Sequence, residues 1–230
     1  MVNKSFSCSF LYQEMNLDNF SIFQDFAREY LGSFFREETF PEINFHSNVL
    51  SSSLNRRFIL STPSVNIELR KNILVVSSQN LDFSNFKNVC LTIINRFTEC
   101  FKPIVFYTGV VGTYDCGNIE SITFPKKMEF FKKIDTFNFK FGFIDSERYY
   151  VNHSFDCVKN VSSDVDLQNP IRKPQRMEVN NTNLFWTLDV NDKYSFLFCA
   201  DSLYQPGFVA KTFDKFSSIF ELGIGAIDNI

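Results

Sequence analysis

Covalent catalysis by a cysteine requires a base within hydrogen-bond reach of the thiol, and this chain offers few bases. Its only histidines are His46 and His153. Cys116 follows an apolar run and precedes Gly117, which makes it the candidate nucleophile, with His153 as the base that the fold would have to bring to it. The competing interpretation is that Cys116 is a small buried apolar residue and His153 a polar side chain on a hairpin. A cysteine-dependent hydrolase is therefore one hypothesis, and no other catalytic residue is assigned.

Metal and nucleotide sites find little support in the residue spacing. The six cysteines include no CxxC pair, so no zinc site is predicted. Two acidic pairs, Asp164 with Asp166 and Asp189 with Asp192, lack a third carboxylate at suitable spacing for Mg²⁺, and we interpret them as solvated loop and turn residues. No glycine-rich phosphate loop opens a helix. We expect neither a metal nor a cofactor.

Basic clusters suggest phosphate binding, because lysine and arginine supply most nucleic-acid affinity and neighbouring aromatic rings can stack on bases. The net charge of -3 gives no overall attraction to nucleic acid or to an anionic membrane, so ordinary solvated surface is the competing interpretation. Nucleic-acid binding is the alternative function. Its candidate residues are Lys126, Lys127, Lys132, Lys133, Arg172, Lys173 and Arg176, with Arg56 and Arg57 as a further basic pair.

Phenylalanine is the most unusual feature of the composition, with 30 residues in a chain of 230. Each buried ring removes a large apolar area from water, so the core should be dominated by aromatic residues. A chain of this length does not readily bury so many rings, and a contiguous exposed apolar patch commonly marks an interface. The leading hypothesis is a non-enzymatic protein–protein interaction module whose sheet edges or aromatic faces bind another protein or a second copy of itself.

The sequence also predicts the setting of the protein. The N-terminal residues lack the apolar core of a secretory signal, and the longest uncharged apolar stretch, 103–114, falls short of the roughly 20 residues of a membrane-spanning helix. The scattered cysteines fit free thiols in a reducing compartment. We expect a cytoplasmic protein without a membrane association.

Hydrophobic periodicity predicts the elements that position these residues. A period of two residues, or a short apolar run between turn signals, predicts the strands, and a period of 3.6 residues predicts the helices. The run 41–55 is rich in serine and asparagine and predicts a short strand followed by a loop, and 159–175 predicts a long loop. The predicted strands are 5–12, 56–62, 65–69, 73–77, 104–114, 137–143, 148–157, 177–190 and 194–200, and the predicted helices are 19–36, 83–101, 124–134 and 207–222.

The order of these elements indicates the fold class. Grouped strands, separated by helices without strict alternation, favour an α+β protein with antiparallel sheets and amphipathic helices packed on one face. The length favours a single domain, 1–230, with two possible similar halves, 1–122 and 123–230. The residues of the two halves show no repeat.

Four segments carry a resemblance to a known family: RRFILSTPSVNIELRKNILVVSSQN, FKNVCLTIINRF, KPIVFYTGVVGTYDCGNI and FWTLDV. In this order they resemble a sporadically distributed family of uncharacterised prokaryotic α+β proteins of about this length. The arginines that the family tends to carry in its glycine-containing strand are missing around Gly109 and Gly112. The resemblance implies a fold and no activity. Its patchy distribution is compatible with a mobile-element, toxin–antitoxin or phage-defence context.

Overall fold

A single antiparallel sheet organises the described part of the chain. The computed structural model describes residues 4–16, 20–46, 49–121, 138–147, 149–163, 177–193 and 206–228. The strands are β1 (Lys4–Tyr12), β2 (Arg36–His46), β3 (Val49–Ser61), β4 (Asn66–Arg70), β5 (Ile73–Ser78), β6 (Val105–Asn118), β7 (Asn138–Ile144), β8 (Tyr150–Ser163) and β9 (Met177–Asn191). The helices are α1 (Ser21–Leu31), α2 (Phe83–Phe101), the short η1 (Ile119–Ser121) and α4 (Pro206–Asp228).

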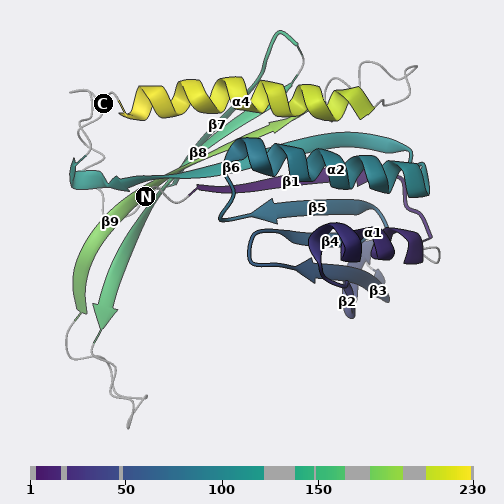
Figure 1. Cartoon of the computed structure of the whole chain (residues 1–230). Helices are drawn as coiled ribbons and strands as arrows, with labels where there is room; N and C mark the ends of the chain where they lie inside the picture. The colour runs from purple at the N-terminus through teal and green to yellow at the C-terminus, as the bar shows by residue number, and fades with distance from the viewer. Residues whose placement is uncertain are drawn as a thin grey trace, which may run out of the picture.

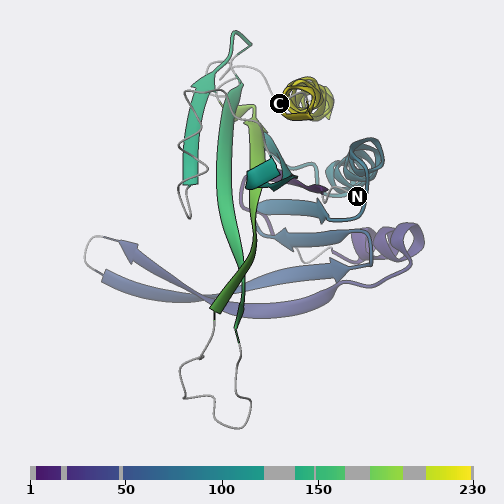
Figure 2. The same cartoon turned by 90° about the vertical axis from the view of Figure 1, so that its left-hand side faces the viewer.

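The nine described strands lie in the order β2-β3-β4-β5-β1-β6-β9-β8-β7. The long helices α1, α2 and α4 all cover the same face of this sheet (Figures 1 and 2). The predicted α+β class, with an antiparallel sheet and helices on one face, is confirmed. Strands from both predicted halves join in the one sheet, because β6 pairs with β9. No helix in the described ranges is long and apolar enough to cross a membrane.

Alternation along β1 shows how the sequence builds the core. Successive side chains of a strand point to opposite faces, and Phe6, Cys8, Phe10 and Tyr12 are buried on the face that the helices cover. Aromatic rings dominate this core, as predicted. The ring of Phe6, for example, contacts four other rings, those of Phe83, Phe86, Phe216 and Phe220.

Local signals set the ends of the two N-terminal helices. The Asp82 carboxylate accepts the backbone N–H of Asn85 at 2.8 Å and caps α2, whose bounds match the predicted 83–101. The predicted helix 19–36 was too long, because Gly32 takes a left-handed conformation with φ of 67° and ends α1. The helix therefore ends at Leu31, and the next strand, β2, begins at Arg36.

The loop predicted within 41–55 is wrong. β2 and β3 form a hairpin paired from Arg36 with Ile59 to His46 with Val49. This hairpin reaches away from the helix layer (Figure 2), and its backbone register continues through the serine- and asparagine-rich stretch. The loop predicted for 159–175 begins later than expected, because β8 continues to Ser163. The predicted helix 124–134 and strand 194–200 lie outside the described residues.

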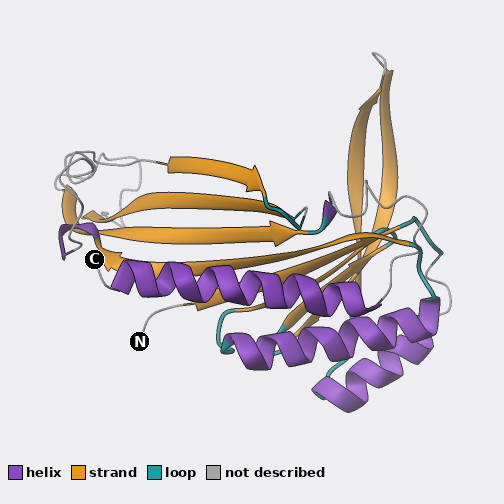
Figure 3. Ribbon diagram, turned by 90° about the horizontal axis from the view of Figure 1, so that it is seen from above, coloured by secondary structure: helices purple, strands orange, loops and turns teal. Residues whose placement is uncertain are grey.

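Helix α4 runs along the sheet (Figure 3), where it contacts β6 and β9. A buried carboxylate holds it there. Asp192 is 3% exposed, so its predicted place in a solvated turn is wrong. One Asp192 oxygen accepts the backbone N–H of Thr108 at 2.7 Å, and the other accepts the hydroxyl of Thr212 on α4 at 3.2 Å. Because Thr108 belongs to β6, this one side chain joins the end of β9 to both a neighbouring strand and the helix.

Candidate functional site

The structure does not bring the candidate pair Cys116 and His153 together. His153 lies opposite Leu188 on β9, whereas Tyr114, two residues before Cys116, lies opposite Trp186. The two candidates are thus displaced by about four residues, or roughly 13 Å, along the strands, with β9 between them. Cys116 Sγ donates instead to the carbonyl oxygen of Tyr114 at 3.9 Å.

The predicted phosphate-binding residues fall into two groups. Only the pair Arg56 and Arg57 lies within the described ranges. Both arginines form ion pairs with glutamates on neighbouring strands of the sheet. Arg56 pairs with Glu37 at 2.5 Å, and Arg57 pairs with Glu38 at 2.7 Å and with Glu68 at 3.7 Å. Glu38 also pairs with Arg36, and Glu68 also pairs with Arg70, so these ion pairs join four arginines to three glutamates. The residues outside the described ranges are Lys126, Lys127, Lys132, Lys133, Arg172, Lys173 and Arg176.

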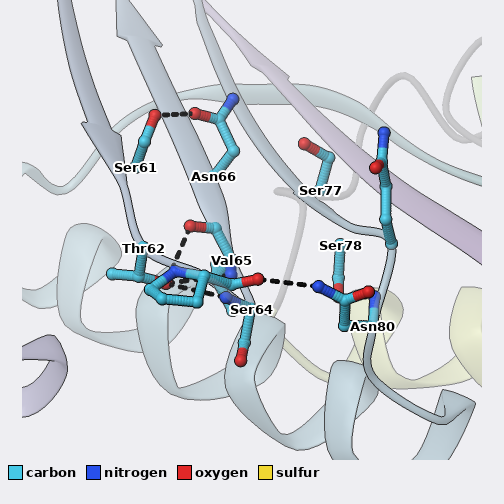
Figure 4. A pocket seen from close by; sticks show the side chains of 10 residues that line it. Ser61, Thr62, Ser64, Val65, Asn66, Ser77, Ser78 and Asn80 are labelled. Atoms are coloured by element: carbon cyan, nitrogen blue, oxygen red, sulfur yellow. Dashed lines mark hydrogen bonds between the residues drawn. The ribbon is translucent and has the colours of Figure 1, made fainter.

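A polar cavity of about 380 Å³ lies between the β3–β4 turn and the segment from β5 to α2 (Figure 4). Its lining residues, Ser61 to Asn66 and Ser77 to Asn80, carry no charge. Its polar groups bond one another: the Thr62 hydroxyl accepts the N–H of Val65 at 2.9 Å, and the Asn80 amide donates to the carbonyl of Pro63 at 2.8 Å. These bonds stabilise turns, and we assign no ligand to the cavity.

The two outer strands of the described sheet differ sharply in chemistry. β2 carries Arg36, Glu37, Glu38 and Pro41, and charged residues and proline are what natural sheets use to prevent pairing at an edge. β7, at the opposite edge, has the sequence NFKFGFI, with Lys140 as its one charge, and each of its 7 residues is exposed. Of these two edges, β7 is the one whose chemistry permits another strand to pair with it.

Three phenylalanines of β7, which we call the aromatic stripe, lie on the side of the sheet that the helices occupy. Phe139, Phe141 and Phe143 are paired with Phe155, His153 and Val151 of β8, and residues opposite one another share a face. Helix α4 contacts β6 and β9 and lies to one side of β7 (Figure 2). The three rings are 48%, 42% and 45% exposed.

A column of near-parallel rings joins the aromatic stripe to the core. Phe141 stacks on His153 with ring centroids 4.7 Å apart, His153 stacks on Trp186 at 5.9 Å, and Trp186 stacks on Phe220 of α4 at 5.1 Å. His153 Nδ1 accepts a hydrogen bond from Trp186 Nε1 at 3.2 Å, so the neutral ring carries its proton on Nε2. Burial lowers the pKa of His153 below its ordinary value of 6.5. The arrangement assigns His153 a packing role.

The turn between β7 and β8 is anchored to α4. One oxygen of Asp145 accepts the backbone N–H groups of Glu147 and Tyr149 at 3.0 and 2.8 Å, and the other pairs with Lys215 of α4. The hydrogen bond to Asp145 raises the pKa of Lys215. The Lys215 ammonium also lies 6.0 Å from the centre of the Tyr149 ring. These contacts fix the position of the edge strand relative to the core.

No protein-family model matches the sequence, and no curated protein matches it. The resemblance to a family of prokaryotic proteins stays a prediction. Sequence reasoning found β7, β8 and His153 but did not recognise β7 as an edge. The sequence did contain a usable signal, which is the difference in charge between the two strands. β7, NFKFGFI, has one charged residue, whereas β2, REETFPEINFH, has three charged residues before its proline and one directly after it.

Proposed function

We propose that the protein is a non-enzymatic protein-interaction module that binds its partner along the outer edge of β7. The observation that carries this proposal is an edge strand with one charge and three half-exposed phenylalanines on one side. A partner that adds an extended strand to β7 would pair with the backbone groups at the outer edge of the described sheet. The same partner would remove the aromatic stripe from water, which is the usual outcome for a contiguous apolar patch.

The anchoring of β7 supports this proposal. The strand is paired with β8 over its whole length, its turn is tied to Lys215, and Phe141 rests on a stacked column that ends in the core. A surface held in its binding conformation loses little conformational entropy when a partner docks. The β7 edge is therefore preorganised for binding.

A photo-crosslinking amino acid placed in the stripe tests the proposal. Phe141 would be replaced by p-benzoylphenylalanine in the full chain, expressed in its native source, and irradiated. We expect a discrete covalent adduct with a protein, identified by mass spectrometry. The matched control carries the same group at Phe34, which is 60% exposed and lies between α1 and β2. Equal labelling from both positions, or none from position 141, would overturn the proposal.

A further inference from the structure

We infer that the strand pairing with β7 is β7 of a second copy of this chain, arranged antiparallel about a two-fold axis at Phe141. This inference rests on the proposed function of the β7 edge and names its partner. A two-fold axis makes the same patch serve both subunits, so the patch must be complementary to itself. The sequence NFKFGFI meets that condition over its full length in one register.

Phe141 is the middle residue of β7, and an axis at this position pairs the full length of the strand with its copy. Phe141 then lies opposite Phe141 of the second copy, and Phe139 lies opposite Phe143 of the second copy. Opposite residues of an antiparallel pair share a face, so the two stripes join into one continuous aromatic row on the helix-covered side. A shift of one residue would place phenylalanines opposite Lys140 or Gly142 and send the two stripes to opposite faces.

The charges of β7 agree with this register. Like charges placed directly opposite one another destabilise a strand pair, and Lys140 lies opposite the uncharged Gly142 of the second copy. At Gly142, the place of a Cβ is already bordered by the Tyr150 hydroxyl at 2.8 Å and the Asn152 amide oxygen at 3.4 Å. The Lys140 ammonium of one copy would thus approach two oxygen atoms that accept hydrogen bonds.

The exposed area sets the strength of the association. An aromatic side chain buries about 150–250 Å² when fully covered, so six rings that are each a little under half exposed contribute roughly 550 Å². Stable specific interfaces bury about 1,200–2,000 Å² in total. Even with the backbone edge added, the pairing stays below this range, where weak and transient associations lie. We expect a reversible dimer with a dissociation constant on the order of micromolar.

Sedimentation of the wild-type chain, and of variants that carry a charge at the two-fold axis, tests the inference. Across a concentration series the wild-type chain should change from a monomer to a dimer. Phe141→Asp and Phe141→Lys each place like charges opposite one another, and each variant should remain monomeric. An equimolar mixture of the two variants places Asp opposite Lys and should recover the dimer. Folding of each variant is checked by circular dichroism, and the matched controls Phe34→Asp and Phe34→Lys should associate like the wild type.

Three results would overturn the second copy as partner: a wild-type chain that is monomeric throughout, Phe141 variants that still dimerise alone, or a mixture that stays monomeric. The crosslinking experiment separates this failure from failure of the proposed function. A discrete adduct between position 141 and a different protein would reject self-pairing and leave the interaction function standing. No discrete adduct at all would reject both.

Discussion

Gly223 of α4 lies directly against the indole ring of Trp186. A Cβ at position 223 would meet Cη2 of Trp186 at 2.2 Å and Cζ2 at 2.7 Å, distances at which atoms must move. The indole is 1% exposed and is held by its stacking on Phe220 and by its hydrogen bond to His153. The absence of a side chain at Gly223 is therefore what allows α4 to approach β9 so closely.

Gly223→Ala is expected to destabilise the protein. Overpacking of a rigid core costs about 1–3 kcal/mol, which exceeds the roughly 1 kcal/mol that alanine gains over glycine inside a helix. Chemical denaturation measures the change. The control is Gly207→Ala in the same helix, where an added Cβ meets no atom within 4 Å and stability should stay equal or rise slightly. Equal effects at both positions would contradict this account of the contact.

Asp192→Ala is expected to loosen α4 from the sheet. The substitution leaves the buried N–H of Thr108 without this acceptor, which costs about 1–3 kcal/mol, and it removes the hydrogen bond from Thr212, whose hydroxyl can still donate to the carbonyl of Phe208 at 3.0 Å. We expect a loss of about 3 kcal/mol in the free energy of unfolding. Thr212→Val removes only the helix side of this link and should cost about 1 kcal/mol. Hydrogen exchange at α4 amides should accelerate more in Asp192→Ala than in Thr212→Val, and the reverse order would contradict the proposed link.

The stability of the protein should fall in mild acid because of His153. Its pKa is lowered in the folded state, so below the ordinary value of 6.5 the unfolded chain binds a proton that the folded chain resists. The contribution of neutral His153 to the free energy of unfolding is fully present above pH 6.5. It is lost as the pH falls from 6.5 through the pKa of His153 in the folded state. Urea denaturation between pH 7.5 and 5 measures this slope, which should be shallower in His153→Gln. A nuclear magnetic resonance titration that places the His153 pKa at or above 6.5 would refute the prediction.

The regular core could be predicted from the sequence because burial imposes a period. β1, β4, β5 and α2 each bury one face, and their apolar residues recur at the spacing of their own backbone. The outer parts of β2 and β3 could not be predicted in this way. Their ladder hydrogen bonds depend on the neighbouring strand and not on side-chain pattern, so a serine- and asparagine-rich stretch forms a strand without an apolar signal.

The candidate site shows a second limit of pattern reasoning. Alternating phenylalanines at 139, 141 and 143 predict a strand with an apolar face, and that strand and its hairpin partner are confirmed. Alternation says nothing about whether another element covers the face. Coverage depends on where α4 crosses the sheet, which is set by distant residues such as Gly223 and Asp192. The exposure of the stripe therefore emerges only from the tertiary structure.

The column of stacked rings gives the chain an intrinsic optical probe. Trp186 is the single tryptophan, so all indole emission comes from one ring separated from Phe141 only by His153. Because His153 stacks on both rings, we expect a movement of Phe141 to change the surroundings of that one fluorophore. We therefore expect occupation of β7 to change the native fluorescence of the unlabelled chain.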